Sequence, residues 1–357
     1  MEFKIDTARL VAMLDDVEKG VGNSKIIPIT EYLQFKLEGE RLSITSTDST
    51  NFITREASGI SGEDGELIIH ADSIIRLAER TTVKEMLFAD KGDHVKVTGN
   101  GVYKVGKMDE EYPSYEFDES SEKFEVDVDA LKETFRVNEP SVAKDMLTPV
   151  LSGYRVGDMT ITTDGIKMAI NKTSLVEGIE FLLTQKMVDL ISAIKDKTAT
   201  IQKDGSKILI KTDGVTIFGN ELEGIEDYPD ITPLLELEHE GNVLVNKKNL
   251  ISSLDRLIIF SDPFDNNGVT MHFKEDVLEL SDLKRNSVET VEYTEVKKAP
   301  DAPVDVTVNV QYLKDLLSVI KGDDVSIFYA QELPIKIEEN SVTQILSTMD
   351  LDEEGEE

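Results

Sequence analysis

The sequence contains no cysteine and only four histidines among its 357 residues. Without cysteine there is no disulfide framework, no thiolate metal site and no thiol nucleophile, which fits a reducing cytoplasm. His70, His94, His239 and His272 do not have the spacing of a metal-binding helix such as His-Glu-x-x-His. No apolar run approaches the roughly 18 residues that cross a bilayer, and the alternating residues 1–6 do not resemble a signal peptide. These absences predict a cytoplasmic protein without a metal or a cofactor.

One segment has part of a nucleotide-binding motif. Residues 101–107 have the spacing of the first part of a P-loop, but Met108 stands where a Ser or Thr should hold Mg²⁺. The segment alternates like a strand, and no helical pattern follows it. Acidic pairs are uninformative in a chain with 71 carboxylates, and no Ser-His-Asp constellation can be argued. We therefore expect that the protein is not an enzyme.

Basic residues are scarce, at 38 Lys and Arg against 71 Asp and Glu, a formal net charge of −33. The scarcity is uneven. Six helical windows together hold 15 basic and 11 acidic residues, a net of +4, whereas the remainder has a net of −37. An acidic shell repels nucleic acid, and basic helices on one shared surface attract phosphates. The alternative is that these cations decorate solvated faces. The windows are residues 7–20, 71–84, 128–138, 184–197, 246–257 and 309–322.

The windows come from a pattern that recurs six times at intervals of 57 to 64 residues. An apolar strand residue is followed by a polar or helix-capping residue, and an aliphatic residue five positions after the strand residue opens a helical stripe. Repeats of this length indicate an array of supersecondary units. The copies are Ile5-Asp6…Leu10, Ile69-His70…Ile74, Val126-Asp127…Leu131, Leu183-Thr184…Val188, Val245-Asn246…Leu250 and Val308-Asn309…Leu313.

A longer period groups the six units in pairs. Asp48, Asp164 and Asp282 follow similar strands at intervals of 116 and 118 residues, which favours a turn or cap role for them. We predict three domains, residues 1–117, 118–238 and 239–357, the last with an acidic tail. Alternation around turns at 38–39 and 157–158 indicates antiparallel strands with one wet face. The predicted fold class is α+β, with antiparallel sheets outside and two helices on one face of each domain.

Three such domains laid in an arc, helices inward, would have a mildly basic inner surface and two different ends. Heterologous ends can close a ring from two chains joined head to tail. No Arg or Asn cluster suggests base reading, so contacts would be to phosphates and would weaken steeply with salt. The candidate phosphate contacts are Lys25, Arg76, Arg80, Lys132, Arg136, Lys186, Lys195, Lys197, Lys247, Lys248, Lys314 and Lys321.

Five short motifs stand in a characteristic order and spacing, at residues 1–5, 27–29, 42–48, 163–169 and 228–230. With these motifs the chain resembles the bacterial β sliding clamp, the processivity subunit of DNA polymerase III, over nearly its whole length. The resemblance implies a head-to-tail homodimer that encircles duplex DNA without sequence specificity, an ATP-driven clamp loader and a tethered DNA polymerase. The acidity suggests a bacteriophage-encoded member that acts in an infected host.

The family also implies a cleft between the second and third domains that takes short peptides, suited to Leu or Phe anchors. Tyr103 on one side of the family's ring-closing contact, and Ile259 and Phe260 on the other side, match its apolar positions. For both sets the alternative is ordinary core packing. By match to the family pattern, the cleft residues are Leu151, Thr163, Gly165, Ile166, Lys167, Met168, Pro229, Pro233, Leu234, Ile345, Leu346, Ser347, Thr348 and Met349.

The chain departs from the family pattern inside this cleft. The family usually has His-Arg where Ile166 and Lys167 stand, and it often ends in an aliphatic-Pro-aliphatic-Arg run where this chain has residues 346–349 and an acidic tail. We expect host peptides to bind less well. Two other functions remain as alternatives: an acidic DNA mimic that inhibits a DNA-binding protein, and, with the least support, an enzyme that acts on nucleic acid.

Overall fold

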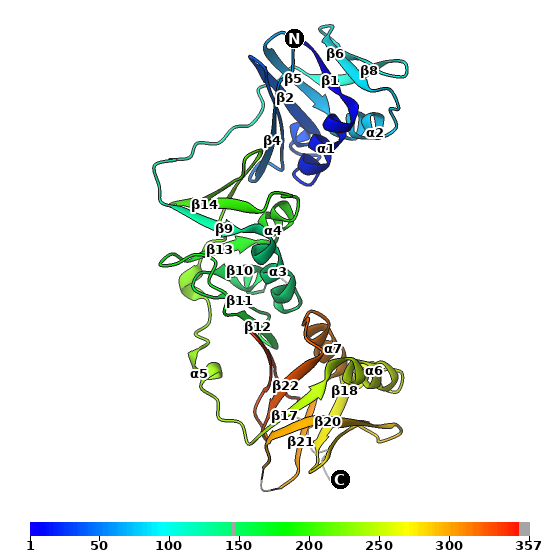
Figure 1. Ribbon diagram of the computed structural model, residues 1–357, viewed down its shortest axis with the longest axis vertical. Helices are drawn as coiled ribbons and strands as arrows, with labels where there is room; N and C mark the ends of the chain where they lie inside the picture. The colour runs from blue at the N-terminus through cyan, green and yellow to red at the C-terminus, as the bar shows by residue number, and fades with distance from the viewer. Residues whose placement is uncertain (145–146, 301, 350–357) are drawn as a thin grey trace. The chain divides into compact units, whose positions relative to one another are not determined.

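The computed structural model describes residues 1–144, 147–300 and 302–349, which form two compact units (Figure 1). The first comprises Met1–Lys132 and Leu183–Glu223, and the second comprises Glu133–Leu182 and Gly224–Glu357. Each unit contains one 12-stranded sheet whose pairings are antiparallel, so the predicted α+β class is confirmed. The predicted domain limits follow the sequence repeat rather than these units, and they stay a prediction.

The first unit contains the sheet with strand order β1-β6-β7-β8-β5-β2-β3-β4-β16-β15-β14-β9, where the strands have the following bounds. They are β1 (Glu2–Asp6), β2 (Tyr32–Glu38), β3 (Arg41–Thr47), β4 (Phe52–Ser58), β5 (Gly65–His70), β6 (Glu85–Asp90), β7 (His94–Thr98), β8 (Val102–Met108), β9 (Lys123–Asp127), β14 (Thr198–Asp204), β15 (Lys207–Lys211) and β16 (Val215–Asn220). The helices are α1 (Thr7–Glu18), α2 (Ala71–Glu79), α4 (Gln185–Ile191) and the 3-10 turn η1 (Pro28–Glu31). The segment that resembled a P-loop is strand β8, as its alternation predicted.

The second sheet has the order β13-β10-β11-β12-β24-β23-β22-β17-β20-β19-β18-β21. Its strands are β10 (Gly153–Val156), β11 (Thr160–Thr163), β12 (Lys167–Asn171), β13 (Phe181–Thr184), β17 (Gly241–Asn246), β18 (Gly268–Phe273), β19 (Val277–Asp282), β20 (Val288–Lys298), β21 (Val304–Asn309), β22 (Asp324–Tyr329), β23 (Ile335–Glu339) and β24 (Val342–Leu346). The helices are α3 (Val128–Asn138), which straddles the two units, α5 (Thr232–Leu235), α6 (Lys247–Leu257), α7 (Val310–Ser318) and the 3-10 turns η2 (Glu139–Ser141), η3 (Pro149–Ser152), η4 (Ile225–Asp227) and η5 (Pro263–Asp265).

The predicted strand–helix unit is found at all six places in the described residues, as β1–α1, β5–α2, β9–α3, β13–α4, β17–α6 and β21–α7. In five of them the polar residue after the strand accepts a hydrogen bond from a backbone N–H of the first helical turn, which satisfies an otherwise orphaned donor. The aliphatic residue that opens each stripe is buried. The capping residues are Asp6, Asp127, Thr184, Asn246 and Asn309.

The helices of a pair pack against each other and against their sheet. Helix α1 contacts α2, β3 and β4, and α6 contacts α7, β17, β19 and β20; Figure 1 shows α6 beside α7. Under α1 and α2 the rings of Phe3, Phe35 and Phe88 lie together, with centroids of Phe3 and Phe88 4.7 Å apart. Among the described helices, none is both long and apolar enough to cross a membrane.

Two turns that the repeat places 116 residues apart have the same hydrogen bonds. The Asp48 carboxylate accepts from the backbone N–H groups of Thr50 and Asn51 at 3.0 and 2.8 Å. Asp164 accepts from Ile166 and Lys167 at 3.0 and 2.7 Å. In both turns the next residue has a left-handed backbone, with φ of +88°. The turn role that we predicted for these aspartates is therefore confirmed.

The repeats are joined by one recurring pairing. Each predicted domain has eight strands in chain order, counted from β1, β9 and β17. The fourth strand of the first domain, β4, pairs with the last strand of the second, β16, and Phe52 lies opposite Phe218. The fourth strand of the second domain, β12, pairs with the last strand of the third, β24, and Met168 lies opposite Ile345. Because the turns before β4 and β12 are equivalent, these two pairings have the same register.

We expect Asp48→Ala to lower the free energy of unfolding by about 1–2 kcal/mol, since two turn N–H groups lose their acceptor. Burial raises the pKa of Asp48, but hydrogen bonds from Asn51 and Thr50 outweigh it and hold that pKa below its ordinary value. The stabilisation is therefore present above the ordinary carboxyl pKa and is lost as pH falls through the lower folded-state pKa. Urea denaturation from pH 8 to pH 3 should show a constant deficit that shrinks below about pH 4.

The matched control is Asp158→Ala, which removes an exposed turn carboxylate for which the described residues provide no hydrogen bond. It should leave the unfolding curve unchanged. An equal effect of both substitutions would contradict the turn account.

Candidate nucleic-acid and partner interfaces

Four of the twelve predicted phosphate-contacting residues donate hydrogen bonds to carbonyls at the C-cap of a neighbouring helix or in the turn directly after it. Those carbonyls lack intrahelical partners and carry the negative end of the helix dipole, so a cation there stabilises the helix. These side chains therefore have structural partners in addition to any role towards DNA. The donor–carbonyl pairs are Lys186–Lys19 (2.6 Å), Arg136–Val319 (2.7 Å), Lys132–Ile194 and Lys247–Ile320.

Five more of the twelve form ion pairs with carboxylates. A phosphate would have to compete with these carboxylates, although exposed pairs of this kind are individually weak. The buried carboxylate among them, Asp16, also lies 3.4 Å from Arg55 on β4. The pairs are Arg76–Asp72 (2.7 Å), Arg80–Glu79 (3.5 Å), Lys195–Asp16 (2.8 Å), Lys314–Asp255 (2.7 Å) and Lys321–Glu133 (2.9 Å).

The remaining three, Lys25, Lys197 and Lys248, are exposed and have no ion-pair partner among the described residues. Arg9 on α1 and Lys84 after α2 are in the same situation, although we did not select them from the sequence. Both lie inside the basic windows, so the charge count was the signal that could have found them. These five cations are the ones most available to a phosphate.

The predicted cleft residues of β11, β12 and β24 lie together. Thr163, Met168 and Ile345 are buried, Lys167 lies opposite Leu346, and the Ser347 N–H donates to the Ile166 carbonyl at 2.9 Å. Beyond Ser347 the chain passes β21, because the Met349 N–H donates to the Thr307 carbonyl at 2.8 Å. The Ile166 side chain is 47% exposed at the tip of the turn that contains Gly165.

Lys167 is almost wholly withdrawn from solvent. Its side chain is 10% exposed, its amine lies 3.3 Å from the Asp164 carboxylate, and it stands 4.6 Å from the centre of the Tyr312 ring on α7. The carboxylate and the aromatic face both compensate the charge. Lys167 therefore does not present a free cation to a ligand, in contrast to what its position in the sequence suggests.

The chain that leads from β16 to β17 lies against β11. The Tyr228 hydroxyl donates to the Ile161 carbonyl at 3.3 Å, and the Arg155 guanidinium stands 5.7 Å from the Tyr228 ring centre. Burial raises the pKa of Tyr228 above its ordinary value. Of the other predicted cleft residues, Leu151 is buried in η3, Pro229 and Pro233 are exposed, and Leu234, Thr348 and Met349 are half-buried. Among the described residues, no hydrogen bond joins these six to the turn at residues 164–167.

The predicted ring-closing residues lie on exposed parts of two strands or loops. Tyr103 is 36% exposed on β8, beside Val102 at 64%. Ile259 and Phe260 follow the end of α6 and are 74% and 54% exposed. The alternative that these are core residues is therefore wrong for Ile259 and Phe260, which have too much exposed apolar surface.

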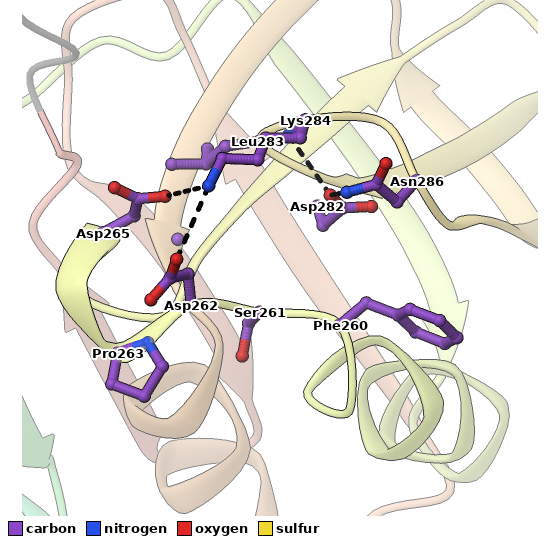
Figure 2. A pocket seen from close by; sticks show the side chains of 10 residues that line it. Phe260, Ser261, Asp262, Pro263, Asp265, Asp282, Leu283, Lys284 and Asn286 are labelled. Carbon is purple, nitrogen blue, oxygen red and sulfur yellow. Dashed lines mark hydrogen bonds and ion pairs between the residues drawn. The ribbon is translucent and has the colours of Figure 1, made fainter.

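Phe260 stands at the edge of a pocket of about 280 Å³ that the sequence did not indicate (Figure 2). On its far side the Lys284 amine lies between Asp262 at 3.5 Å and Asp265 at 3.4 Å. Asp282, the third of the repeated aspartates, accepts from the Ser287 N–H at 2.5 Å and from the Lys284 N–H at 3.2 Å. The pocket thus joins an apolar edge to a polar wall. Within the described ranges no cluster of acidic and histidine side chains is arranged to hold a metal ion.

Comparison with known proteins places these features in one family. Residues 1–116 match the family model described as the DNA polymerase III beta subunit, N-terminal domain, and residues 233–349 match the C-terminal domain of the same subunit. The Beta sliding clamp of Bacillus subtilis (strain 168) is 22% identical over 353 residues, 92% of this chain and 93% of the relative. The Beta sliding clamp of Staphylococcus aureus (strain Mu50 / ATCC 700699) is 20% identical over 97% of this chain and 98% of the relative.

Solved structures show the same fold. The crystal structure of the DNA polymerase sliding clamp from Bacillus subtilis has a TM-score of 0.89 at 20% identity and covers 98% of this chain and 99% of its own. The beta subunit from the DNA polymerase of Streptococcus pyogenes has a TM-score of 0.90 at 17% identity, with 98% and 100% covered. The architecture is thus retained although four residues in five differ.

We expect Lys132→Met and Lys247→Met each to lower the free energy of unfolding by about 1 kcal/mol, since each leaves a helix-terminal carbonyl without its donor. Lys197→Met, directly before β14, and Lys248→Met, on α6, remove exposed lysines and should change the free energy of unfolding by less than about 0.5 kcal/mol. Chemical denaturation of the four variants tests this. Equal effects of all four would contradict the assignment of Lys132 and Lys247 to helix ends.

Proposed function

Since this chain belongs to the family of bacterial DNA polymerase III β subunits, the β sliding clamps, we propose that two copies close head to tail around duplex DNA and tether the replicative polymerase. The protein is then a processivity factor of DNA replication that acts in the bacterial cytoplasm. The ring retains DNA by enclosing it rather than by bonding to it, and we propose no catalytic activity for the protein. An ATP-driven loader opens and closes the ring.

The observation that carries the proposal is the recurring strand pairing. In each predicted domain the fourth strand pairs with the last strand of the following domain, as β4 with β16 and β12 with β24. Two strands of these classes are left over, β8 as a last strand and β20 as a fourth strand. Residues 102–106 of β8 pair only with β7, and residues 288–292 of β20 pair only with β19, among the described residues. One further pairing of the same kind, between copies, would use both.

The equivalence of the turns also gives the register of this pairing. The N–H of Ser287 bonds Asp282 as the N–H of Asn51 bonds Asp48, so Val288 is equivalent to Phe52. Val102, Val215 and Val342 each follow the last hairpin turn of their domain, so Val105 is equivalent to Phe218. We therefore propose that Val288 lies opposite the partner's Val105, Glu289 opposite Lys104, and Thr290 opposite Tyr103.

Charge favours this closure. Lys96 and Lys104 lie directly opposite each other on β7 and β8, both are exposed, and neither has an ion-pair partner in the part of the chain that the structure describes. Two like charges in that position destabilise a sheet unless another group compensates them. Strand β20 carries Glu289, Glu292 and Glu295. Glu289 is already paired with Arg256 at 2.6 Å, so the proposed edge-to-edge contact would bring the lysines chiefly to Glu292 and Glu295, with Ile259 and Phe260 as the apolar flank.

We propose the six helices as the DNA-facing elements and the three predicted domains, 1–117, 118–238 and 239–357, as the segments of the arc. Lys25, Lys197 and Lys248, with Arg9 and Lys84, would provide the principal phosphate contacts. The nine predicted cations that bond helix-end carbonyls or carboxylates would contribute to the electrostatic potential of this surface more than to direct contacts with DNA. Weak contacts of this kind leave the clamp free to slide.

The junction of β12 and β24 is the proposed docking place for linear segments of the polymerase and the loader. The equivalent junction of β4 and β16 is closed by the chain itself, because the Tyr115 ring stacks on Phe218 at 4.1 Å and Phe117 packs on the same cluster. At the second junction the buried aliphatic Ile231 stands where Tyr115 stands in the first, and the chain then continues into α5 with Pro233 exposed. This difference supports docking at the second junction alone.

A disulfide between copies tests ring closure and register together, because the native chain has no cysteine. Tyr103→Cys with Thr290→Cys places two thiols directly opposite in the proposed pairing, at a Cβ separation of about 4.5–5.5 Å that small adjustments bring into disulfide range. Oxidised on a circular plasmid, this variant should give a protein–DNA complex that survives SDS and is released when the plasmid is cut.

The matched control is Tyr103→Cys with Glu292→Cys, which moves the second thiol two residues along the same face and to about 7–8 Å. It should cross-link slowly and trap little DNA. Efficient cross-linking without retention on circular DNA would refute the clamp and fit the alternative DNA mimic. Preferential cross-linking of the control would refute the register only.

Substitution of Lys25, Lys197 and Lys248 together by alanine should weaken binding to duplex DNA and flatten its salt dependence by up to about 0.9 in slope per lost phosphate contact. The control is Lys91→Ala, an exposed lysine between β6 and β7 outside the six helices. Titration of a labelled duplex at several salt concentrations measures both. A triple variant with the native slope would exclude these lysines as phosphate contacts.

A further inference from the structure

We infer that the linear segments which dock at the junction of β12 and β24 are basic: an aliphatic or aromatic anchor flanked by Lys or Arg. This inference rests on the proposed function, which places partner docking at that junction. It concerns the chemistry of the partner, and it follows from a comparison of two equivalent sites within this one chain.

Ile166 is an exposed apolar residue that its turn does not require. The turns at Asp48 and Asp164 share their hydrogen bonds and their left-handed residue, so position 50 in one turn is equivalent to position 166 in the other. Both side chains are exposed, but the first is Thr50 and the second is Ile166. The turn geometry is satisfied by threonine and does not require an aliphatic residue. We therefore assign the exposed Ile166 side chain, directly before β12, to an apolar contact with a partner.

The segment that lies near Ile166 is acidic. The segment 224–240 contains six carboxylates and no Lys or Arg, and none of the six has an ion-pair partner among the described residues. It is held near the turn through Tyr228, which bonds β11 two residues before Thr163. In the equivalent segment between β8 and β9, Lys211 pairs with Glu119 at 2.6 Å and Lys107 with Asp109 at 2.9 Å. The carboxylates of segment 224–240 are thus left for a partner.

The two cationic side chains near this turn, Lys167 and Arg155, already have partners within the chain. Lys167 is buried against Asp164 and Tyr312, and Arg155 bonds Glu180 at 3.1 Å. Asp230 is exposed, and the backbone N–H of Thr232 holds its pKa below the ordinary value. An incoming peptide therefore meets an apolar residue next to a segment whose six carboxylates have no ion-pair partner among the described residues. Charge complementarity selects a cationic segment and disfavours the chain's own residues 350–357, which are mostly acidic.

The experiment compares two short synthetic peptides with the same Leu-Phe anchor, one flanked by lysines and one by glutamates, by fluorescence polarisation on the full-length protein. We expect the lysine peptide to bind at least about fivefold tighter at low salt, because each exposed charge pair changes an affinity by roughly two- to fivefold. The gap should narrow as salt is raised. Asp227→Asn with Asp230→Asn should weaken the lysine peptide alone, and Asp213→Asn, in the exposed turn between β15 and β16, should weaken neither.

Ile166→Thr, which copies the first turn, should weaken both peptides. Equal or tighter binding of the glutamate peptide, with Ile166→Thr still harmful, would overturn the basic partner and leave the docking place standing. Binding of neither peptide, or no effect of Ile166→Thr, would overturn the docking place itself. Tighter binding of the glutamate peptide after removal of residues 350–357 would identify the tail as the occupant instead. The disulfide trap on circular DNA reports on the clamp function separately from all of these results.

Discussion

The pairing of one domain's fourth strand with the next domain's last strand is the constraint on which the rest of the structure depends. It fuses strands from different repeats into continuous sheets, at β4–β16 and at β12–β24. An edge strand with unpaired N–H and C=O groups is a template for another chain. The same rule that joins the repeats therefore leaves β8 and β20 as the two complementary ends. A head-to-tail ring is the arrangement that satisfies both ends with the contact already used twice inside the chain.

The cations of the helices have a second consequence. The helix windows are basic relative to the rest of the chain, yet most of the selected side chains bind helix-end carbonyls or carboxylates. The basic composition of these windows therefore predicts which elements face a polyanion, but it does not identify which side chains are free to contact one. A surface in which few cations are free holds DNA weakly, and weak, sequence-independent contact is what sliding requires.

Much of the fold could be predicted because its signals are local. Asp6, Asp127, Thr184, Asn246 and Asn309 cap helices as expected, since a cap needs only its own side chain and the next turn. Alternation around Gly39 gave the hairpin of β2 and β3 for the same reason. The compact units were not foreseeable, because contacts that group distant segments leave no periodic trace in one sequence.

The sites were predictable only in part. Lys167 lies at the expected junction, but its burial against Asp164 and Tyr312 depends on a helix 145 residues later in the chain. The partners of Lys132 and Lys247 are carbonyls, which every residue has, so no sequence pattern marks them. Arg9 and Lys84 were missed because a charge count ranks windows rather than side chains. Tyr103, Ile259 and Phe260 came from resemblance, and their exposure was the feature that the structure added.

The most direct test of the central claim is an electron-microscopic image of the purified protein. We expect closed rings of two copies, with six domain-sized segments around an opening wide enough for a double helix. Compact particles of one copy without an opening would contradict it.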